Sequence, residues 1–200
     1  MNDDARFEQR LEAYARHANA PYVQFLRRLG LAREFVRAEG SLVWDAGGAR
    51  FIDCIAGYGN LNLGHNHPAV IDAVVEELRS PRPFNLPFVS EVHARFVEEF
   101  ARAAPGDLEA VLVVNSGAEA VDGALKLARL ATGKPGVVAM RGAFHGFTFG
   151  ALAASEPAMK KPFEPLAPEF VHVPYGDVDA AVAAIGERTG CVLVEPIQSE

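Results

Sequence analysis

The sequence contains little cysteine: Cys54 and Cys191 are the only two among its 200 residues, and they form no Cys-x-x-Cys pair. Each cysteine lies in an apolar, strand-like run, which predicts two buried and unreactive thiols. His65 and His67 have no cysteine or acidic partner nearby and lie in a turn of Gly, Asn and Pro. We therefore expect no metal site and a structural role for both histidines.

Long hydrophobic runs and an excess of basic charge are also absent. No apolar stretch is long enough to span a bilayer, and the acidic start of the chain lacks a signal-peptide core. The chain has 19 basic and 26 acidic residues, and its formal net charge is −7. Because nucleic-acid binders more often carry a basic face, that class is disfavoured. We expect a cytoplasmic protein with neither a nucleic-acid nor a membrane partner.

The composition is that of a globular protein, with 50% hydrophobic and 22% charged residues. Residues up to about Gly40 carry apolar side chains among Arg and Glu and are predicted to form a helical arm. Two short runs of alternating polarity, 42–45 and 50–54, predict a hairpin. Two further helices are expected, over 68–78 and, capped by Ser90, up to about residue 103.

From residue 110 onward, strand-like and helix-like segments alternate. Short apolar runs rich in β-branched residues predict strands, and apolar residues at helical spacing predict helices. The alternation predicts an α/β fold with a mainly parallel sheet covered by helices. The predicted strands are 110–114, 136–140, 170–173 and 191–195, and the predicted helices are 118–130, a short one near Gly150, and one from Val178 that Asp177 caps.

The most informative stretch runs from Asn115 to Ala120, with the sequence Asn-Ser-Gly-Ala-Glu-Ala, between a predicted strand and a predicted helix. A small-residue turn at a helix N-terminus leaves backbone N–H groups unsatisfied, and these groups and the helix dipole favour an anion. We therefore expect a bound phosphate here, with an empty tight turn as the alternative. The stretch is neither an ATP-type glycine loop nor the Gly-x-Gly-x-x-Gly dinucleotide fingerprint.

Four stretches follow one another along the chain: 63–68 (Leu-Gly-His-Asn-His-Pro), 115–127, 142–146 (Gly-Ala-Phe-His-Gly) and 194–200 (Val-Glu-Pro-Ile-Gln-Ser-Glu). In that order they resemble the Gly-His-x-His-Pro turn, phosphate-binding segment, Phe-His-Gly cofactor segment and Glu-Pro-Ile-Gln-Gly-Glu segment of the class III aminotransferases, with Ser199 where the family usually has Gly. These are fold type I enzymes that depend on pyridoxal 5′-phosphate. The resemblance implies an incomplete fold type I α/β transferase with an N-terminal helical arm and hairpin. Residues 1–80 would belong to the small domain and 81–200 to the first part of the large cofactor-binding domain.

The resemblance also implies which residues hold the cofactor. The N–H groups of Gly117 and Ala118, with the Ser116 hydroxyl, would bind its phosphate. Phe144 would stack on the pyridine ring; a core phenylalanine is the alternative, although the glycines near it let backbone approach a ligand. His145 either packs near the cofactor or satisfies its own turn.

Two glutamates, Glu195 and Glu119, are expected to have different roles. Glu195 ends a predicted apolar strand at the carboxyl edge of the sheet, where open α/β sheets bind ligands, and the resemblance implies a position near the cofactor. A solvated strand end is the alternative. Glu119, in the first helical turn, is expected to favour the helix dipole and to have no chemical role.

The resemblance implies three substrate-facing residues. Tyr58 matches a position that lines the pocket in ornithine-type members, with an ordinary loop tyrosine as the alternative, and Glu200 matches one that pairs with a later arginine. Phe147 stands where the family often has an arginine that binds a substrate carboxylate. Because a phenyl ring cannot replace a bidentate guanidinium, we expect an amine, a diamine such as putrescine, or an apolar ω-amino or β-amino substrate.

In the family, the aspartate that pairs with the pyridine nitrogen and the Schiff-base lysine come later than the Glu-Pro-Ile-Gln segment. None of the lysines of this chain matches that residue, and all are expected on the solvated surface: Lys126, Lys134, Lys160 and Lys161. We therefore expect no catalytic residue here and a Schiff-base lysine beyond Glu200. The 200 residues would be the N-terminal portion of a longer enzyme and inactive alone.

The expected activity is transfer of the amino group of a primary amine, diamine or ω-amino acid to a keto acid, by a homodimer. Two alternatives stay open: a non-transaminase member of the same family, such as an aminomutase or decarboxylase, and a truncated, non-catalytic remnant. A nucleotide-binding module ranks last because its glycine fingerprints are absent.

Overall fold

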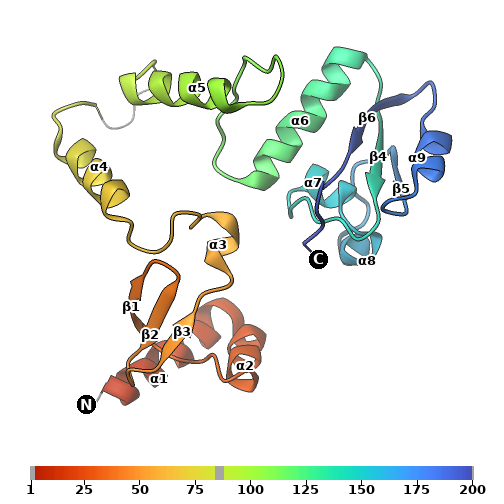
Figure 1. The fold of residues 1–200 in the computed structure, drawn as a ribbon. Coiled ribbons are helices and arrows are strands. Elements are labelled where there is room, and N and C mark those ends of the chain that lie inside the picture. The colour runs from red at the N-terminus through yellow and green to blue at the C-terminus, as the bar shows by residue number, and fades with distance from the viewer. Residues whose placement is uncertain (1–2, 84–87, 200) are drawn as a thin grey trace. The chain divides into compact units, whose positions relative to one another are not determined.

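The computed structural model describes residues 3–83 and 88–199. The chain forms two compact units, Met1–Phe88 and Val89–Glu200 (Figure 1), and each has a sheet of its own. The assignment of residues 1–80 and 81–200 to a small and a large domain stays a prediction. Among the described residues, no helix is both long and apolar enough to cross a membrane.

The first unit begins with three consecutive helical segments. Helix α1 (Asp3–Tyr14) runs into a π-helical turn, η1 (Ala15–Asn19), and then into α2 (Ala20–Arg28). The Asn19 side chain caps α2, because its Oδ1 accepts a hydrogen bond from the Tyr22 N–H (2.9 Å). The predicted helical arm is therefore present as far as the end of α2.

The prediction that the helical arm continues to Gly40 is wrong. The Leu31 N–H donates to the Leu26 carbonyl (2.9 Å), a bond typical of a closed helix C-terminus. The next segment forms strand β1 (Phe35–Glu39), which pairs antiparallel with β2 (Leu42–Asp45). Aromatic and β-branched residues at its start favour a strand, and the pairing with β2 satisfies its backbone groups.

The predicted hairpin is confirmed. Strand β2 pairs antiparallel with β3 (Arg50–Ile52), so the sheet has the order β1-β2-β3. Cys54, predicted to be buried, is exposed, because β3 ends before it and the residue lies outside the sheet. The short segment α3 (Ala56–Gly59) and helix α4 (Pro68–Arg79) follow, and α4 begins at the predicted proline.

The second unit begins with α5 (Glu91–Ala103). Ser90 caps this helix as predicted, because its Oγ accepts the His93 N–H (3.1 Å). The predicted strand over 110–114 does not form. A strand needs a neighbour that satisfies its backbone groups, and none of the described strands pairs with this segment.

A parallel sheet forms the centre of the second unit, as predicted. Strand β4 (Gly136–Met140) lies between β5 (Phe170–Val173) and β6 (Thr189–Leu193), and both pairs are parallel. Strand β6 begins and ends two residues earlier than predicted. Glu195 therefore follows this strand instead of ending it.

The core of the second unit surrounds β4. Val137, Val138 and Ala139 are at most 1% exposed, which is typical of a central strand covered on both faces. The remaining helical segments are α6 (Gly117–Thr132), α7 (Phe149–Ala154), α8 (Pro157–Lys160), the 3₁₀ turn η2 (Lys161–Phe163) and α9 (Val178–Ala184). Helix α9 packs its alanines on the core, and α6 contacts both β6 and α7.

Candidate functional site

The N-terminus of α6 carries the predicted phosphate-binding turn. Ser116 caps the helix, because its Oγ accepts the Glu119 N–H (3.2 Å), and Glu119 Oε2 in turn accepts the Asn115 N–H (2.7 Å). Glu119 therefore has the structural role expected of it. The N–H groups of Gly117 and Ala118 lie in the first turn, where no helical carbonyl reaches them. They point from the positive end of a 16-residue helix.

An open hollow of about 770 Å³ lies beside these two amides. The segment after β4, residues 141–146, supplies the opposite side, and we call it the Phe144 loop. The hollow brings together five of the predicted site residues. Its lining consists of Gly117, Ala118, Val121, Phe144, His145, Gly146, Phe147 and Thr148.

Gly146 lets the Phe144 loop meet the start of α6. The residue is buried and has φ +123°, a conformation that side chains other than glycine rarely adopt. A Cβ at this position would lie 2.5 Å from Ala118 Cβ and 2.9 Å from Ala118 Cα. The contact continues at Thr148, whose hydroxyl donates to the Ala118 carbonyl (3.3 Å). The close approach of the two segments therefore requires a glycine.

His145 is buried, with 9% of its surface exposed, and its Nε2 has no hydrogen-bond partner among the described residues. Its backbone N–H, and not its imidazole, satisfies the turn by donating to Ser155 Oγ (3.0 Å). Burial lowers the pKa of His145, and the negative charge of Glu195 opposes this shift. The imidazole is thus neutral near pH 7. A buried, unpartnered nitrogen in the wall of the hollow suits a ligand with a polar atom.

Glu195 contacts the backbone of the Phe144 loop. Its Oε2 accepts the Phe144 N–H at 3.0 Å, and the carboxylate is half-buried. Glu195 is not among the residues that line the hollow. The Phe144 ring is half-buried and meets the Phe147 ring edge-on, with centroids 5.1 Å apart.

Tyr58 belongs to the first unit and lies on α3, where the backbone is left-handed. The φ angles of Ala56, Gly57, Tyr58 and Gly59 are +48°, +59°, +56° and +90°. A left-handed conformation costs a residue other than glycine about 1–2 kcal/mol, so Ala56 and Tyr58 are strained. We call this segment the Tyr58 turn. Its tyrosine is 94% exposed.

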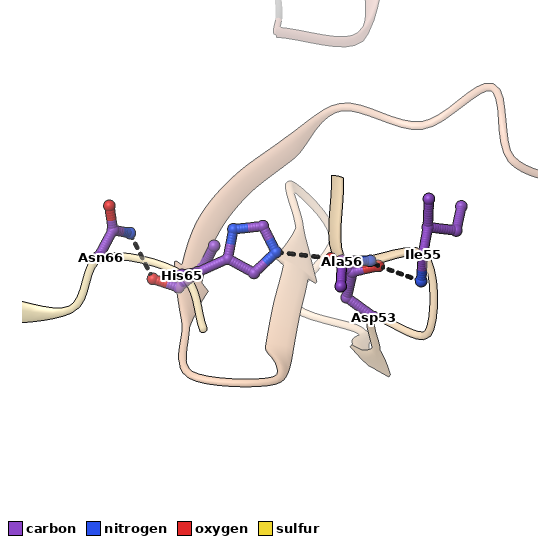
Figure 2. Close-up of polar contacts among 6 residues, drawn as sticks. Asp53, Ile55, Ala56, His65 and Asn66 are labelled. Carbon is purple, nitrogen blue, oxygen red and sulfur yellow. Dashed lines mark hydrogen bonds and ion pairs between the residues drawn. The ribbon is translucent and has the colours of Figure 1, made fainter. Parts of the chain in front are cut away.

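Asp53 holds the start of the Tyr58 turn (Figure 2). Its Oδ1 accepts the N–H groups of Ile55 (2.8 Å) and Ala56 (3.1 Å), and its Oδ2 lies 2.7 Å from His65 Nε2. These hydrogen bonds lower the pKa of Asp53, with the Ile55 N–H as the largest cause. His65 therefore has an acidic partner, and the expectation that it has none is wrong. Asn66 adds a bond from its Nδ2 to the Ala38 carbonyl (2.7 Å).

Three residues that hold the segments just described were not singled out from the sequence: Asp53 in the first unit, and Ser155 and Glu156 in the second. Asp53 lies two and three residues before the amides that it binds, a spacing typical of an Asx turn, so a local signal existed. Ser155 and Glu156 bind backbone groups ten or more residues away, and no local pattern reports such contacts. Glu200 lies outside the described residues.

Lys160 differs from the prediction of a solvated lysine. It is half-buried, its Nζ donates to the Ala153 carbonyl (3.0 Å), and burial lowers its pKa against the opposing charges of Glu164 and Glu156. Lys160 does not line the hollow at α6. No group of three or more His, Cys, Asp or Glu suited to a metal occurs among the described residues.

Sequence comparison decides the family. The profile described as aminotransferase class-III matches residues 27–200. The chain belongs to the class-III aminotransferase family. It is 47% identical, over 166 residues, to an acetylornithine aminotransferase of Methanopyrus kandleri, which covers 82% of this chain and 43% of the relative. It is 39% identical, over 187 residues, to an uncharacterized aminotransferase of Archaeoglobus fulgidus, and this match covers 94% of this chain and 44% of the relative. This class-III chain thus spans less than half the length of these curated relatives.

Solved structures support the same conclusion. The ornithine aminotransferase from Toxoplasma gondii superposes with a TM-score of 0.76 and 29% identity, covering 84% of this chain and 41% of that one. That structure has partial occupancy of pyridoxal phosphate at its active site. The predicted fold, a part of a fold type I α/β transferase, is therefore confirmed.

Proposed function

We propose that the protein transfers the amino group of a primary amine, diamine or ω-amino acid to a keto acid, with pyridoxal phosphate as cofactor. The observation that carries this proposal is the hollow between α6 and the Phe144 loop. It combines two first-turn amides, an aromatic ring and a buried imidazole nitrogen to which no described residue bonds. Membership of the aminotransferase family supports the same activity.

The phosphate of the cofactor would lie at the N-terminus of α6. The N–H groups of Gly117 and Ala118 would donate to its oxygens, and the helix dipole would favour its charge. The Ser116 oxygen already accepts from Glu119, but its hydroxyl hydrogen remains able to donate to a phosphate oxygen.

The Phe144 loop would orient the ring of the cofactor. Pyridoxal phosphate, when bound, supplies an electron sink for a carbanion next to nitrogen. The Phe144 ring offers a flat face and would shield one side of the bound cofactor from water. His145, neutral near pH 7, can donate or accept one hydrogen bond through Nε2.

Two exposed residues bear on the substrate. Phe147 is 65% exposed beside Phe144 and has no cationic group, so it offers apolar contact and no bond to a carboxylate. This favours donors that lack a carboxylate at that point. Tyr58 is proposed as a further substrate contact because its turn holds it exposed at a cost in backbone energy. We also propose a homodimer.

The test is an amino-transfer assay on the protein encoded by the complete gene, purified with pyridoxal phosphate. Primary amines, diamines and ω-amino acids are each offered with 2-oxoglutarate or pyruvate. We expect donor consumption that requires both the keto acid and the cofactor. Release of carbon dioxide or an isomerised donor without a keto acid would instead indicate a decarboxylase or aminomutase and would contradict the proposal.

A further inference from the structure

The Phe144 loop is irregular, yet each residue from 141 to 145 is bonded through its backbone to a partner outside the loop. Side chains provide four of these contacts and the main chain adds others. The partners are Gln198 Nε2 for the Arg141 carbonyl (2.8 Å), Glu156 for the Gly142 N–H, the Glu156 N–H for the Ala143 carbonyl (2.8 Å), Glu195 Oε2 for the Phe144 N–H (3.0 Å) and Ser155 Oγ for the His145 N–H (3.0 Å).

The bonds to Glu195 and Gln198 both connect the Phe144 loop to the segment after β6, and the Glu195 bond is the one that reaches Phe144 itself. Glu195 follows β6 by two residues, and the Phe144 loop follows β4, with Ala139 opposite Leu193 in the parallel register. The carboxylate therefore joins the segments that follow the carboxyl ends of two neighbouring strands, and Phe144 and Glu195 are 51 residues apart in the chain. It binds the backbone of Phe144, whose side chain forms part of the lining of the hollow.

The chemistry of this contact favours a fixed loop. A carboxylate that accepts a backbone N–H forms a charge-assisted bond, which is stronger than a bond between neutral groups. Both groups are partly withdrawn from water, so the amide has few alternative acceptors. Glu195 does not itself line the hollow.

We infer that Glu195 is a positioning residue: its carboxylate fixes the Phe144 backbone, and through it the ring, instead of contacting the cofactor. The inference rests on the proposed function for the role of the ring. For the bond to the Phe144 N–H, the length of the side chain at position 195 should therefore matter more than its charge. A side chain of the same length with a neutral acceptor should keep a weaker form of the bond, whereas a shorter carboxylate should lose it.

Two variants separate reach from charge. Glu195→Gln keeps the length and an acceptor oxygen but removes the charge, whereas Glu195→Asp keeps the charge and withdraws it by one methylene group. Glu187→Asp, at an exposed position of the same unit, is the matched control. Hydrogen exchange of peptides covering 141–147 is measured in the cofactor-free protein, with β4 as the internal reference, and affinity for added pyridoxal phosphate is measured by its absorbance.

We expect Glu195→Asp to speed exchange in 141–147 about tenfold, the effect of losing a bond to a charged group, and to weaken cofactor affinity. Glu195→Gln keeps a neutral and therefore weaker acceptor, so it should change both measurements less than Glu195→Asp does, and Glu187→Asp should leave both unchanged. Loss of affinity in Glu195→Gln with unchanged exchange would overturn the inference, because the charge would then act on the ligand directly. Unchanged exchange in Glu195→Asp would also overturn it. If the unaltered protein takes up no pyridoxal phosphate, the proposed function fails, and the exchange result still decides the role of Glu195.

Discussion

The Tyr58 turn and the Phe144 loop are both held by carboxylates that accept backbone N–H groups, but they are held over very different distances. Asp53 binds amides two and three residues along the chain, whereas Glu195 binds an amide 51 residues away. The first segment is exposed and left-handed, and the second is buried against α6. A strained, exposed turn thus depends on local bonds, while the loop that lines the hollow depends on the completed sheet.

The largest effect is expected from adding a methyl group where backbone segments meet. Gly146→Ala would place its Cβ 2.5 Å from Ala118 Cβ, and Gly64→Ala in the first unit would place its Cβ 2.8 Å from Gly40 Cα at φ +83°. Each should destabilise its own unit by about 3 kcal/mol. Hydrogen exchange resolved by unit measures both. Gly186→Ala, which meets nothing within 4 Å, is the control, and equal effects of all three would contradict this account.

The next effect concerns the hydrogen bonds that Asp53 makes to the Tyr58 turn. Asp53→Ala removes the acceptor of two amides and the partner of His65, so exchange in residues 54–61 should rise about tenfold. Exchange in the Phe144 loop should not change. Asp72→Ala, an exposed carboxylate on α4, serves as the control. If hydrogen exchange in residues 54–61 is equally fast without the Asp53 carboxylate, the Asp53 bonds do not stabilise the Tyr58 turn.

Donor preference gives a smaller and more specific effect. Phe147→Arg places a guanidinium at the edge of the hollow, where it can bind a carboxylate in a bidentate manner. The ratio of kcat/KM between a donor with a carboxylate at that point and one without should rise about fivefold. Phe147→Leu controls for loss of the ring. An unchanged ratio in the arginine variant would remove Phe147 from the substrate argument.

Acid should affect the two units in different pH windows. Burial lowers the pKa of the His145 and His172 imidazoles in the folded protein. As the pH falls, the unfolded chain therefore protonates these imidazoles before the folded protein does. The second unit should lose stability once the pH falls below about 6.5, the ordinary pKa of histidine. Hydrogen bonds lower the pKa of Asp45 and Asp53, so their contribution should persist until the pH falls below about 4. Exchange rates of each unit, corrected for intrinsic pH dependence, test the order. If the first unit lost stability at a higher pH than the second unit, the predicted order would be contradicted.

Local signals predicted much of the fold. Ser90 and Asp177 cap helices where they were expected, because a cap and its amide are only a few residues apart. The hairpin and the parallel sheet followed from side-chain periodicity. Five residues assigned to the site also line one hollow, a grouping that the family motifs implied.

What the sequence did not predict depends on distant partners. The segment 110–114 has a strand-like composition, but none of the described strands pairs with it, whereas 35–39 forms a strand because β2 pairs with it. The acidic partner of His65 is brought to it by folding from 12 residues away. Likewise, Glu195 was expected near a ligand, but its bond to the Phe144 backbone appears only once β4 and β6 are adjacent.

The central claim, that the N-terminus of α6 binds the cofactor phosphate, is tested most directly at Gly117. Gly117→Pro removes one N–H at a helix position where proline is tolerated, after a Ser116 backbone that is already extended. Gly117→Ala keeps the N–H and has open space for its methyl group. Affinity for pyridoxal phosphate, with phosphate-free pyridoxal as reference, should fall about tenfold in the proline variant alone. Equal affinity of both variants for pyridoxal phosphate would contradict the claim.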